Sequence, residues 1–535
     1  MSSRSSRRTA DQVRPTPLPV ALLLAAIGGI LALLAFPPYD LWMLLPVSLA
    51  LLSGAVMTRS WISGALAGLV WGLAFFVPLT EWAGTYAGTM PWIALGMVQA
   101  LYIVPFALAA RTLLVRRGPG AVSAVVVALL WVGIETLRSH WPWGGLPWGA
   151  TGFALQDSPL LNLGPWIGMS GLAFVVGLIG QMLFLGGASL LGRRQERRNG
   201  LIGVWPLAGA TAAILVGVLV PLPHNPTPPD RPTIAIAGIQ GNVPPIDPDD
   251  LAMPPEVFWN HVEASDLAIE DAAAEGRDLD LIVWPEDSAG NDPRIDQARG
   301  DALTDVTRRA GAPVLVGTQT LTDEGRHRYN MSLLWDAEGG VTDEYAKRHP
   351  VPFGEYIPAR DVFRMVTDKV DMVSIDMLPG DEVGVMPIAG HDVGVLICFE
   401  IAYENLVRDT VTEGAEVIVV QSNNALFGDS NEAIQQLAEA RVLSVISGRS
   451  IVHVSTVGHS AIVTPDGRTL DFVDHWEQGV VQADVPLRTG TTPAMAAGPW
   501  PAAALCLLGI AGWAFAMSTE RRVIAIRSRQ RGGRR

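Results

Sequence analysis

Long uninterrupted apolar stretches constrain this chain more than any other feature of its sequence. About 20 apolar residues suffice for a helix to cross a bilayer, and such a helix satisfies its own backbone hydrogen bonds. The mean hydropathy of +0.30 and the apolar content of 49% are high for a wholly soluble protein. Eight stretches of roughly spanning length predict membrane helices at 17–36, 39–57, 61–82, 90–111, 120–138, 162–190, 203–221 and 497–517.

The distribution of arginine predicts the orientation of these helices. Short cytoplasmic loops collect Lys and Arg, whereas loops on the other side do not. The connections around 37–38, 81–88 and 139–159 are nearly free of positive charge. We therefore expect both termini to be cytoplasmic and residues 225–495 to lie outside the cytoplasm. The alternate connections and the C-terminal tail carry the arginines: Arg59, Arg111, Arg116, Arg117, Arg193, Arg194, Arg197, Arg198, Arg521, Arg522, Arg527, Arg529, Arg531, Arg534 and Arg535.

After a proline-rich linker at 221–232 the pattern changes to short β-branched runs that alternate with helical stretches. This pattern is typical of an α/β domain whose sheets are covered by helices on one face, and two such sheets can pack as a four-layer α-β-β-α sandwich. The predicted strands are 233–240, 279–285, 313–319, 330–336, 393–399, 416–422 and 450–456, and the predicted helices are 255–275, 295–310, 402–413 and 431–447.

The resulting fold class is a multi-domain chain with an eight-helix transmembrane bundle and an α/β sandwich domain. Its predicted parts are a basic tail at 1–16, membrane helices 1–7 at 17–222, an extracytoplasmic domain at 223–496, an eighth helix at 497–517 and a second basic tail at 518–535.

The charge pattern excludes some classes of function. The net charge is −14, and acidic residues crowd 225–490, so no basic stripe for nucleic acid lies in the folded part. The nine histidines show neither an HExxH motif nor paired Cys/His spacing. We therefore expect no metal, no cofactor and no nucleic-acid partner.

The apolar run VGVLICFE at 393–400 delivers one cysteine, Cys398, to the end of a predicted strand. The second of the two cysteines, Cys506, lies in the last apolar stretch, so a disulfide between them is not expected. Cys398 is then a free thiol, which is either a small packed hydrophobe or a nucleophile.

Two further strand ends carry groups that can cooperate with such a thiol. Glu286 follows LIVWP and Lys347 lies in EYAKRHP. In acyl transfer a carboxylate accepts the proton of the thiol, and an ammonium stabilises the oxyanion of the tetrahedral intermediate. The backbone N–H of Phe399 is a second candidate oxyanion donor. Taken singly, these residues also fit an exposed turn acid, a solvated lysine and a packed thiol.

At these positions the sequence resembles the carbon–nitrogen hydrolase (nitrilase) superfamily, whose Glu-Lys-Cys triad matches Glu286, Lys347 and Cys398. Seven helices before such a domain and one after it resemble the membrane-bound branch, the apolipoprotein N-acyltransferases. The resemblance implies functional roles for Glu355, within PFGE, and for Glu400, beside the cysteine. Asn330 and Gln240 are supporting candidates within matching motifs, which are GIQGN (238–242), YNMSLL (329–334), KRHPVPFGEYIP (347–358) and LFGDS (426–430).

The resemblance implies a bacterial inner-membrane enzyme, expected to be a monomer, that transfers a fatty acyl chain in two steps. Cys398 would take the chain from a membrane phospholipid as a thioester. The α-amino group of an N-terminal S-diacylglyceryl-cysteine in an apolipoprotein would then accept it as an amide. The alternatives are a membrane-anchored amidase of the same superfamily and a non-catalytic lipoprotein-binding paralogue.

The sequence also departs from the family pattern. Phe399 stands where a Tyr is common, and Asn424 and Leu426 replace the Asp and Trp of an Asn-Asp-x-Trp-Phe-Gly motif. We expect these positions to shape the acyl-chain and acceptor pockets. The segment 353–378 is long and weakly periodic, and is either a mobile lid or an ordered surface excursion. The tryptophan-rich loop 141–148 is either an interfacial belt or a part of lipid access.

Overall fold

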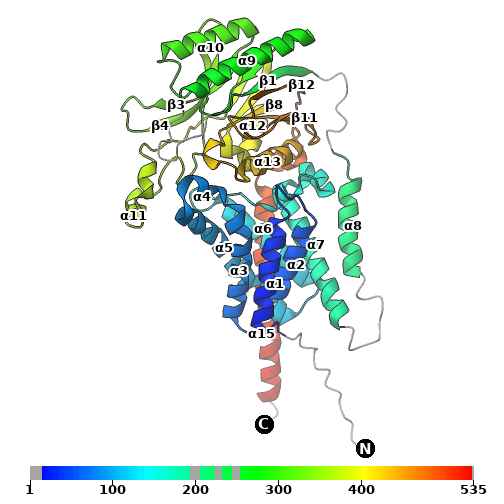
Figure 1. Cartoon of the computed structure of the whole chain (residues 1–535). Helices are drawn as coiled ribbons and strands as arrows, with labels where there is room; N and C mark the ends of the chain where they lie inside the picture. The colour runs from blue at the N-terminus through cyan, green and yellow to red at the C-terminus, as the bar shows by residue number, and fades with distance from the viewer. Residues whose placement is uncertain (1–14, 193–204, 223–231, 244–253, 533–535) are drawn as a thin grey trace, which may run out of the picture.

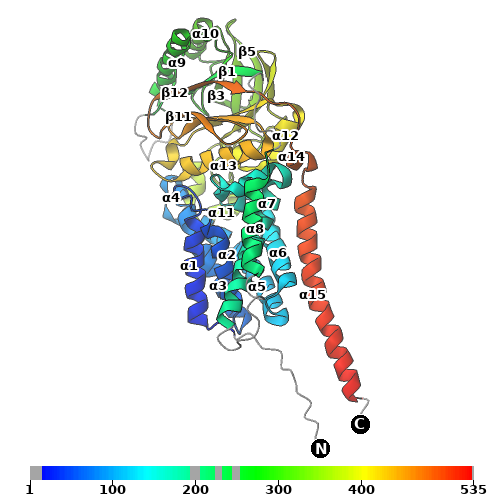
Figure 2. The ribbon, with the colours of Figure 1, turned by 90° about the vertical axis from the view of Figure 1, so that its right-hand side faces the viewer.

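A computed structural model describes residues 15–192, 205–222, 232–243 and 254–532. The chain forms a helical bundle with an α/β domain seated on one of its ends (Figure 1). The view turned by 90° shows the same arrangement, with α15 running along one side of the bundle (Figure 2). Most of the predicted N-terminal basic tail and the arginines at 193–198 lie outside the described residues.

Each of the eight predicted apolar stretches contains a helix, and five helices among the described residues are long and apolar enough to cross a membrane, namely α3, α5, α6, α7 and α15. The helices α1, α2 and α8 are shorter, with 16, 13 and 15 residues, so eight crossings remain a prediction. Helix α15 also continues past the predicted end at 517. The bounds are α1 (Leu18–Leu33), α2 (Leu44–Val56), α3 (Trp61–Leu79), α5 (Thr89–Arg117), α6 (Ala121–His140), α7 (Gly164–Gly192), α8 (Trp205–Leu219) and α15 (Trp500–Gly532).

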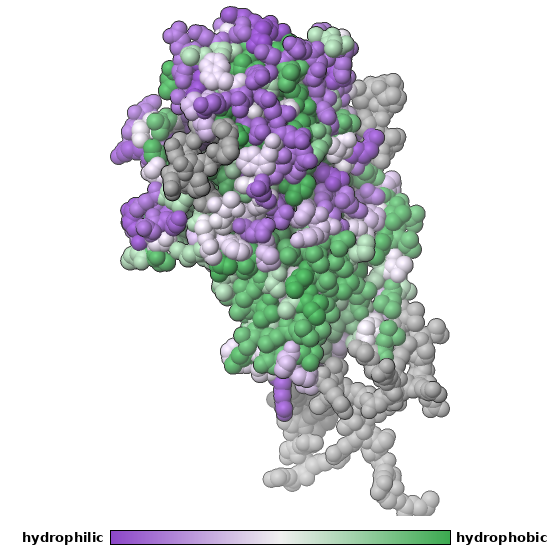
Figure 3. All heavy atoms as spheres, viewed as in Figure 1, coloured by the Kyte–Doolittle hydropathy of each residue, from purple (hydrophilic) through white to green (hydrophobic). Residues whose placement is uncertain are grey.

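The outer surface of the bundle is apolar. Figure 3 shows a continuous hydrophobic zone over the bundle, below a largely hydrophilic α/β domain. Its exposed side chains include Leu23, Ile30, Leu219 and Leu507. A contiguous apolar surface of this kind marks contact with lipid or protein in place of water. The described part of the chain is therefore built as a membrane protein with a polar domain attached.

Small residues let the membrane helices approach closely. A Cβ atom added at Gly72 in α3 would lie 2.7 Å from the Cα of Ala100 in α5, and one added at Gly29 in α1 would lie 2.6 Å from the Cβ of Ala74. Because lipid offers no hydrophobic driving force for helix association, such close van der Waals packing is a main source of stability in a membrane bundle. These glycines therefore fix where α3 meets its neighbours.

The α/β domain contains two six-stranded sheets in the orders β12-β1-β2-β3-β4-β5 and β11-β10-β9-β8-β7-β6. All seven predicted strands are present, whereas β5, β6, β10, β11 and β12 were not predicted. The central pairs β1–β2–β3 and β7–β8–β9 are parallel. The bounds are β1 (Thr233–Gln240), β2 (Leu281–Val283), β3 (Val314–Leu321), β4 (Arg328–Trp335), β5 (Val341–Ala346), β6 (Val385–Ile388), β7 (His391–Ile397), β8 (Val417–Ser422), β9 (Ser450–Ser455), β10 (Ser460–Val463), β11 (Thr469–Val473) and β12 (Gly479–Pro486).

The sheets pack face to face between two layers of helices, as the sequence predicted. Helices α9 (Glu256–Glu275) and α10 (Gln297–Ala310) cover the first sheet, and α12 (Glu404–Glu413) and α13 (Glu432–Ser447) cover the second. The buried amide of Gln421 in β8 ties the sheets together, because its Nε2 donates to the carbonyl of Trp284 at 2.5 Å. This bond joins the two sheets near the carboxyl ends of β8 and β2.

Polar contacts along α13 fix the α/β domain to the bundle. The indole Nε1 of Trp148 donates to Gln435 Oε1 at 2.7 Å, and Gln435 Nε2 donates to the carbonyl of Pro37 at 3.3 Å. Further along α13, Arg441 donates to Gln156 Oε1 at 2.8 Å. Buried hydrogen bonds of this kind are costly to break without water, so the two parts have a defined relative orientation.

The close approach at Gly72 gives a testable consequence. We expect Gly72→Leu to lower the free energy of unfolding by about 1–3 kcal/mol, because the new side chain must push α5 away. Thermal unfolding of the purified protein in detergent measures the effect. Gly133→Leu in α6 is the matched control, because a Cβ at Gly133 meets nothing within 4 Å. Equal melting temperatures for the two variants would contradict the packing described.

Candidate active site

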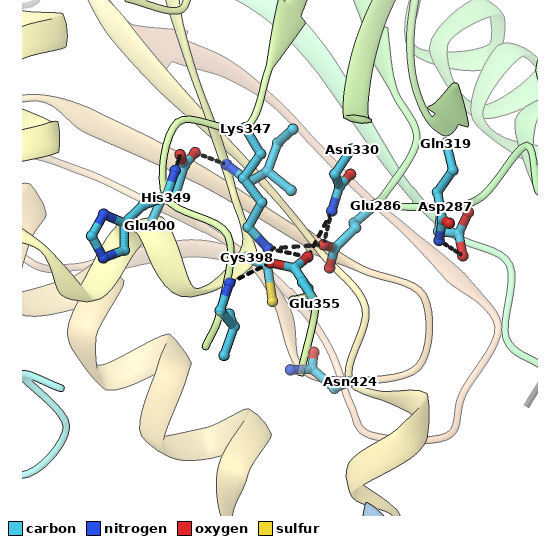
Figure 4. Close-up of polar contacts among 12 residues, drawn as sticks. Glu286, Asp287, Gln319, Asn330, Lys347, His349, Glu355, Cys398, Glu400 and Asn424 are labelled. Carbon is cyan, nitrogen blue, oxygen red and sulfur yellow. Dashed lines mark hydrogen bonds and ion pairs between the residues drawn. The ribbon is translucent and has the colours of Figure 1, made fainter. Parts of the chain in front are cut away.

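The ends of strands from both sheets bring the predicted residues together. Glu286 follows β2, Lys347 follows β5 and Cys398 follows β7. The carboxyl ends of parallel strands form the edge at which α/β sheets hold their ligands. Figure 4 shows the sulfur of Cys398 and the side chains of Lys347, Glu286 and Glu355 converging on one spot. Glu286 and Cys398 are 112 positions apart in the sequence, and the fold makes them neighbours.

Cys398 occupies a sharp turn at the end of β7. Its φ angle is +55°, and the chain continues directly into the short 3-10 helix η4 (Cys398–Ala402). A residue with a side chain is rarely held in this left-handed region, and such positions concentrate at functional sites. The side chain is buried, with 5% of its surface exposed, and neither Cys398 nor Cys506 forms a disulfide, as the sequence predicted.

A buried ammonium lies between two carboxylates. Lys347 Nζ donates to Glu355 Oε1 at 2.8 Å and to Glu286 Oε1 at 3.3 Å. Asn330 Nδ2 donates to the same two oxygens, at 3.1 Å and 2.6 Å respectively. Glu355 is fixed further by the backbone N–H of Val351, which donates to its other oxygen at 2.6 Å. The second glutamate implied by the family resemblance is therefore a direct partner of the lysine.

The charges in this cluster set the protonation of the lysine and the cysteine. Burial disfavours the ammonium of Lys347, but the carboxylates of Glu355 and Glu286 outweigh it, and the pKa of Lys347 lies well above its usual value. Burial and the charge of Glu286 raise the pKa of the Cys398 thiol well above its usual value, while Lys347 acts in the opposite direction. The cluster therefore holds a neutral thiol beside a charged lysine.

Glu400 positions the two chain segments that carry Lys347 and Cys398. It is fully buried, and its Oε1 accepts from the backbone N–H groups of Arg348 at 2.7 Å and His349 at 3.1 Å. Its Oε2 accepts from the backbone N–H of Ile397 at 2.8 Å. Burial raises the pKa of Glu400, and these bonds counteract it. One carboxyl group thus ties the residue after the lysine to the residue before the cysteine.

Phe399 contributes an aromatic wall on the side facing the bundle. Its ring stacks on Trp148 with a centroid distance of 4.9 Å and contacts Trp82 edge-on at 5.5 Å. Trp148 is almost completely buried, whereas Trp141 and Trp143 of the same loop are exposed. Within the tryptophan-rich loop, Trp148 therefore packs beside the site, whereas Trp141 and Trp143 are exposed. Their role at a membrane interface stays a prediction.

Gln240 lies outside this cluster. Its Nε2 donates to the backbone carbonyls of Asp474 and Glu477 at 2.8 Å and 2.9 Å, and its Oε1 accepts from Ser460 at 2.5 Å. These contacts hold the end of β1 against the loop before β12. Asp287, next to Glu286, also turns away from the sulfur toward Gln319 (Figure 4).

In a second polar cluster beside the sulfur, sequence reasoning singled out Asn424 but missed Glu432 and Gln436. Asn424, after β8, donates from Nδ2 to Glu432 Oε2 at 2.6 Å and to Gln436 Oε1 at 3.0 Å. Gln436 in turn lies against Cys398. Burial raises the pKa of Glu432 to about 8, and the hydrogen bond from Asn424 opposes that rise. The available signal was a pair of polar residues four apart in α13, which face the same side of a helix.

The segment 353–378 is an ordered excursion in the structure. It contains α11 (Arg360–Arg364) and the 3-10 helix η3 (Asp368–Met372), with a small apolar core of its own. Phe353 and Phe363 pack edge-on against each other at 4.8 Å, and both contact Trp143. Its first residues supply Glu355 to the site. A role as a mobile lid stays a prediction.

Comparison with known proteins identifies the family. Residues 28–182 match the model of the apolipoprotein N-acyltransferase N-terminal domain, and residues 234–493 match that of the carbon-nitrogen hydrolases. Apolipoprotein N-acyltransferase of Mycolicibacterium smegmatis is 33% identical over 526 residues, which cover 95% of this chain and 86% of that protein. The chain belongs to the apolipoprotein N-acyltransferase family.

Other relatives align over nearly the same length. The apolipoprotein N-acyltransferase of Methylococcus capsulatus is 30% identical over 510 residues, which cover 93% of this chain and 96% of that protein. Among solved structures, Saccharomyces cerevisiae Nit3, of the nitrilase superfamily, aligns with a TM-score of 0.37 and 16% identity, covering 48% of this chain and 90% of that one. Family membership makes this chain an acyltransferase of lipoprotein maturation in a bacterial membrane.

The charge of Lys347 has a measurable effect on the thiol. We expect Lys347→Met to slow alkylation of Cys398 by iodoacetamide at pH 8 about tenfold, because loss of the ammonium raises the pKa of the thiol further. Mass spectrometry of the labelled peptide gives the rate. Lys369→Met, in the outer segment, is the control and should alkylate at the rate of the unmodified protein. Faster alkylation of Lys347→Met would refute this electrostatic account.

Glu400 gives a second prediction. Glu400→Gln places an amide NH₂ against backbone N–H donors, so we expect loss of about 3 kcal/mol of stability. We also expect acyl transfer to fall at least about tenfold, because Lys347 and Cys398 lose their common anchor. Thermal unfolding and a transfer assay measure the two effects. The control is Glu344→Gln, at a half-exposed position; wild-type behaviour of Glu400→Gln would show that the anchor is dispensable.

Proposed function

We propose that this protein transfers a fatty acyl chain from a membrane phospholipid to the α-amino group of the N-terminal S-diacylglyceryl-cysteine of apolipoproteins, through a thioester on Cys398. The observation that carries the proposal is the cluster of Glu286, Lys347 and Cys398 in an α/β domain, close to its contact with the helical bundle. A thiol, a carboxylate and a fixed ammonium are the groups that acyl transfer requires.

In the first half-reaction Glu286 accepts the proton of the Cys398 thiol, and the sulfur attacks the ester carbonyl of the phospholipid. Lys347 and the backbone N–H of Phe399 stabilise the oxyanion of the tetrahedral intermediate. The C–O ester bond then breaks, and the proton on Glu286 passes to the leaving oxygen. The products are lysophospholipid and a thioester of Cys398. Glu355 and Asn330 hold Lys347 and Glu286 in place throughout.

In the second half-reaction the acceptor amine attacks the thioester carbonyl. Glu286 takes a proton from the amine, Lys347 again stabilises the oxyanion, and the C–S bond breaks to leave an amide. The proton on Glu286 returns to the sulfur. A buried thioester is shielded from water, which favours the amine as acceptor. The same three residues therefore serve both halves, as expected of a ping-pong mechanism.

The surroundings of the site support a lipid donor. Phe399, next to the nucleophile, packs on Trp82 and Trp148, both of which belong to the bundle. The residue next to the nucleophile is therefore in contact with apolar side chains of the bundle. Aromatic rings of this kind also suit the boundary between lipid tails and head groups.

The arrangement of the chain supports the proposed orientation. Helix α1 begins and α15 ends at the end of the bundle opposite the α/β domain (Figures 1 and 2). Together with the arginine distribution, this supports cytoplasmic termini and a catalytic domain outside the cytoplasm. We propose that the enzyme acts there as a monomer on lipoproteins that have already received their diacylglyceryl group.

The proposed function predicts a trapped intermediate. Purified protein incubated with phospholipid alone should gain the mass of one acyl chain on the peptide that contains Cys398, and should release lysophospholipid. Adding a diacylglyceryl peptide should remove this mass and give the N-acylated peptide. Mass spectrometry measures both steps, and Cys398→Ala is the negative control.

Other results would point to the alternatives. Free fatty acid or ammonia without acylated peptide would indicate an amidase-like hydrolase. A Cys398→Ala protein that still sustains the cellular role would indicate a non-catalytic binding protein.

A further inference from the structure

The sulfur of Cys398 has a polar neighbour that the mechanism above does not use. Gln436 Nε2 in α13 lies 3.6 Å from Cys398 Sγ, within the range of a hydrogen bond to sulfur, and the Gln436 side chain is fully buried. The charged or titratable groups that act on the sulfur are Glu286, Lys347, Glu432 and Glu355. Gln436 is neutral and approaches from the helix that covers the second sheet.

The neighbouring side chains determine which end of the Gln436 amide faces the sulfur. Asn424 Oδ1 accepts from the hydroxyl of Ser455, and Glu432 Oε2 accepts one hydrogen of Asn424 Nδ2. The second hydrogen of Nδ2 goes to Gln436 Oε1 at 3.0 Å. The oxygen of Gln436 is thereby occupied, and its NH₂ group is directed at Cys398.

We propose that Gln436 is a further catalytic residue, which donates an N–H hydrogen bond to the Cys398 sulfur whenever that sulfur carries negative charge, and that Asn424 and Glu432 are positioning residues that fix the polarity of its amide. The inference rests on the proposed function. Sulfur is anionic as the thiol loses its proton to Glu286, and again when the C–S bond of the thioester breaks. Hydrogen bonds to a charged acceptor are stronger than those to a neutral thiol, so the interaction favours these steps over the resting state.

The test removes the donor without changing the size of the side chain. In a Cys506→Ala background, Gln436→Met should raise the pH of half-maximal iodoacetamide alkylation of Cys398 by about one unit. It should also slow thioester formation from phospholipid about tenfold at neutral pH. Gln436→His keeps a ring N–H and should return the alkylation profile to that of the unmodified protein.

Gln435→Met is the matched control. This residue is the same type and one position earlier in α13, but it bonds Trp148 and Pro37 of the bundle. Gln435→Met should lower thermal stability and leave the pH of half-maximal alkylation unchanged. A merely structural role for Gln436 would give Gln436→Met the same behaviour as this control, and that result would overturn the inference.

Asn424→Asp tests the polarity of the network with Gln436 intact. An aspartate accepts only, so Gln436 should rotate its NH₂ toward residue 424 and its oxygen toward the sulfur. The alkylation profile should then move to higher pH by more than Asn424→Asp moves it in the Gln436→Met background, where only the added charge acts. An unchanged profile in Gln436→Met, or equal shifts from Asn424→Asp in the two backgrounds, overturns the inference alone if the unmodified protein still traps a thioester. Absence of that thioester overturns the proposed function itself.

Discussion

The buried ammonium of Lys347 is the group around which the α/β domain is arranged. A charge removed from water is stable only where opposite charges and hydrogen bonds replace its hydration. Here Glu355 and Glu286 supply them, and Asn330 bonds both carboxylates. Each partner comes from a different part of the chain, so the lysine is satisfied only when both the sheet and the segment after it are folded.

The same arrangement keeps the Cys398 thiol neutral at rest. Burial and the nearby carboxylates disfavour a thiolate, whereas Lys347 favours it. In the proposed mechanism, negative charge on the sulfur or on the oxyanion is stabilised mainly while Glu286 carries the proton, because protonated Glu286 no longer opposes that charge. The proposed transfer of the thiol proton to Glu286 suits a nucleophile that acts only when substrate is in place.

The sequence was sufficient for the central strands and for the principal groups of the site, and insufficient for elements stabilised only by tertiary contacts. Runs of β-branched residues predict the apolar strands β7 and β8. The ends of these strands then predict where Cys398 and Asn424 lie. The edge strands β5 and β11 are short and have one buried residue each, so local pattern does not distinguish them from loops. Gln436 and Glu432 resemble ordinary polar residues of a surface helix, because only the fold shows that α13 is buried on nearly all sides.

Adjacent residues of helix α13 contact the bundle and the site. Gln435 is bonded to the bundle, and Gln436, the next residue, lies against the nucleophile. A change in how the α/β domain sits on the bundle would therefore act on a residue directly beside the one that contacts the Cys398 sulfur. An α/β domain separated from the bundle would lose the rings of Trp82 and Trp148 beside Phe399 and the bonds that Gln435 makes, so the surroundings of the sulfur depend on the membrane helices.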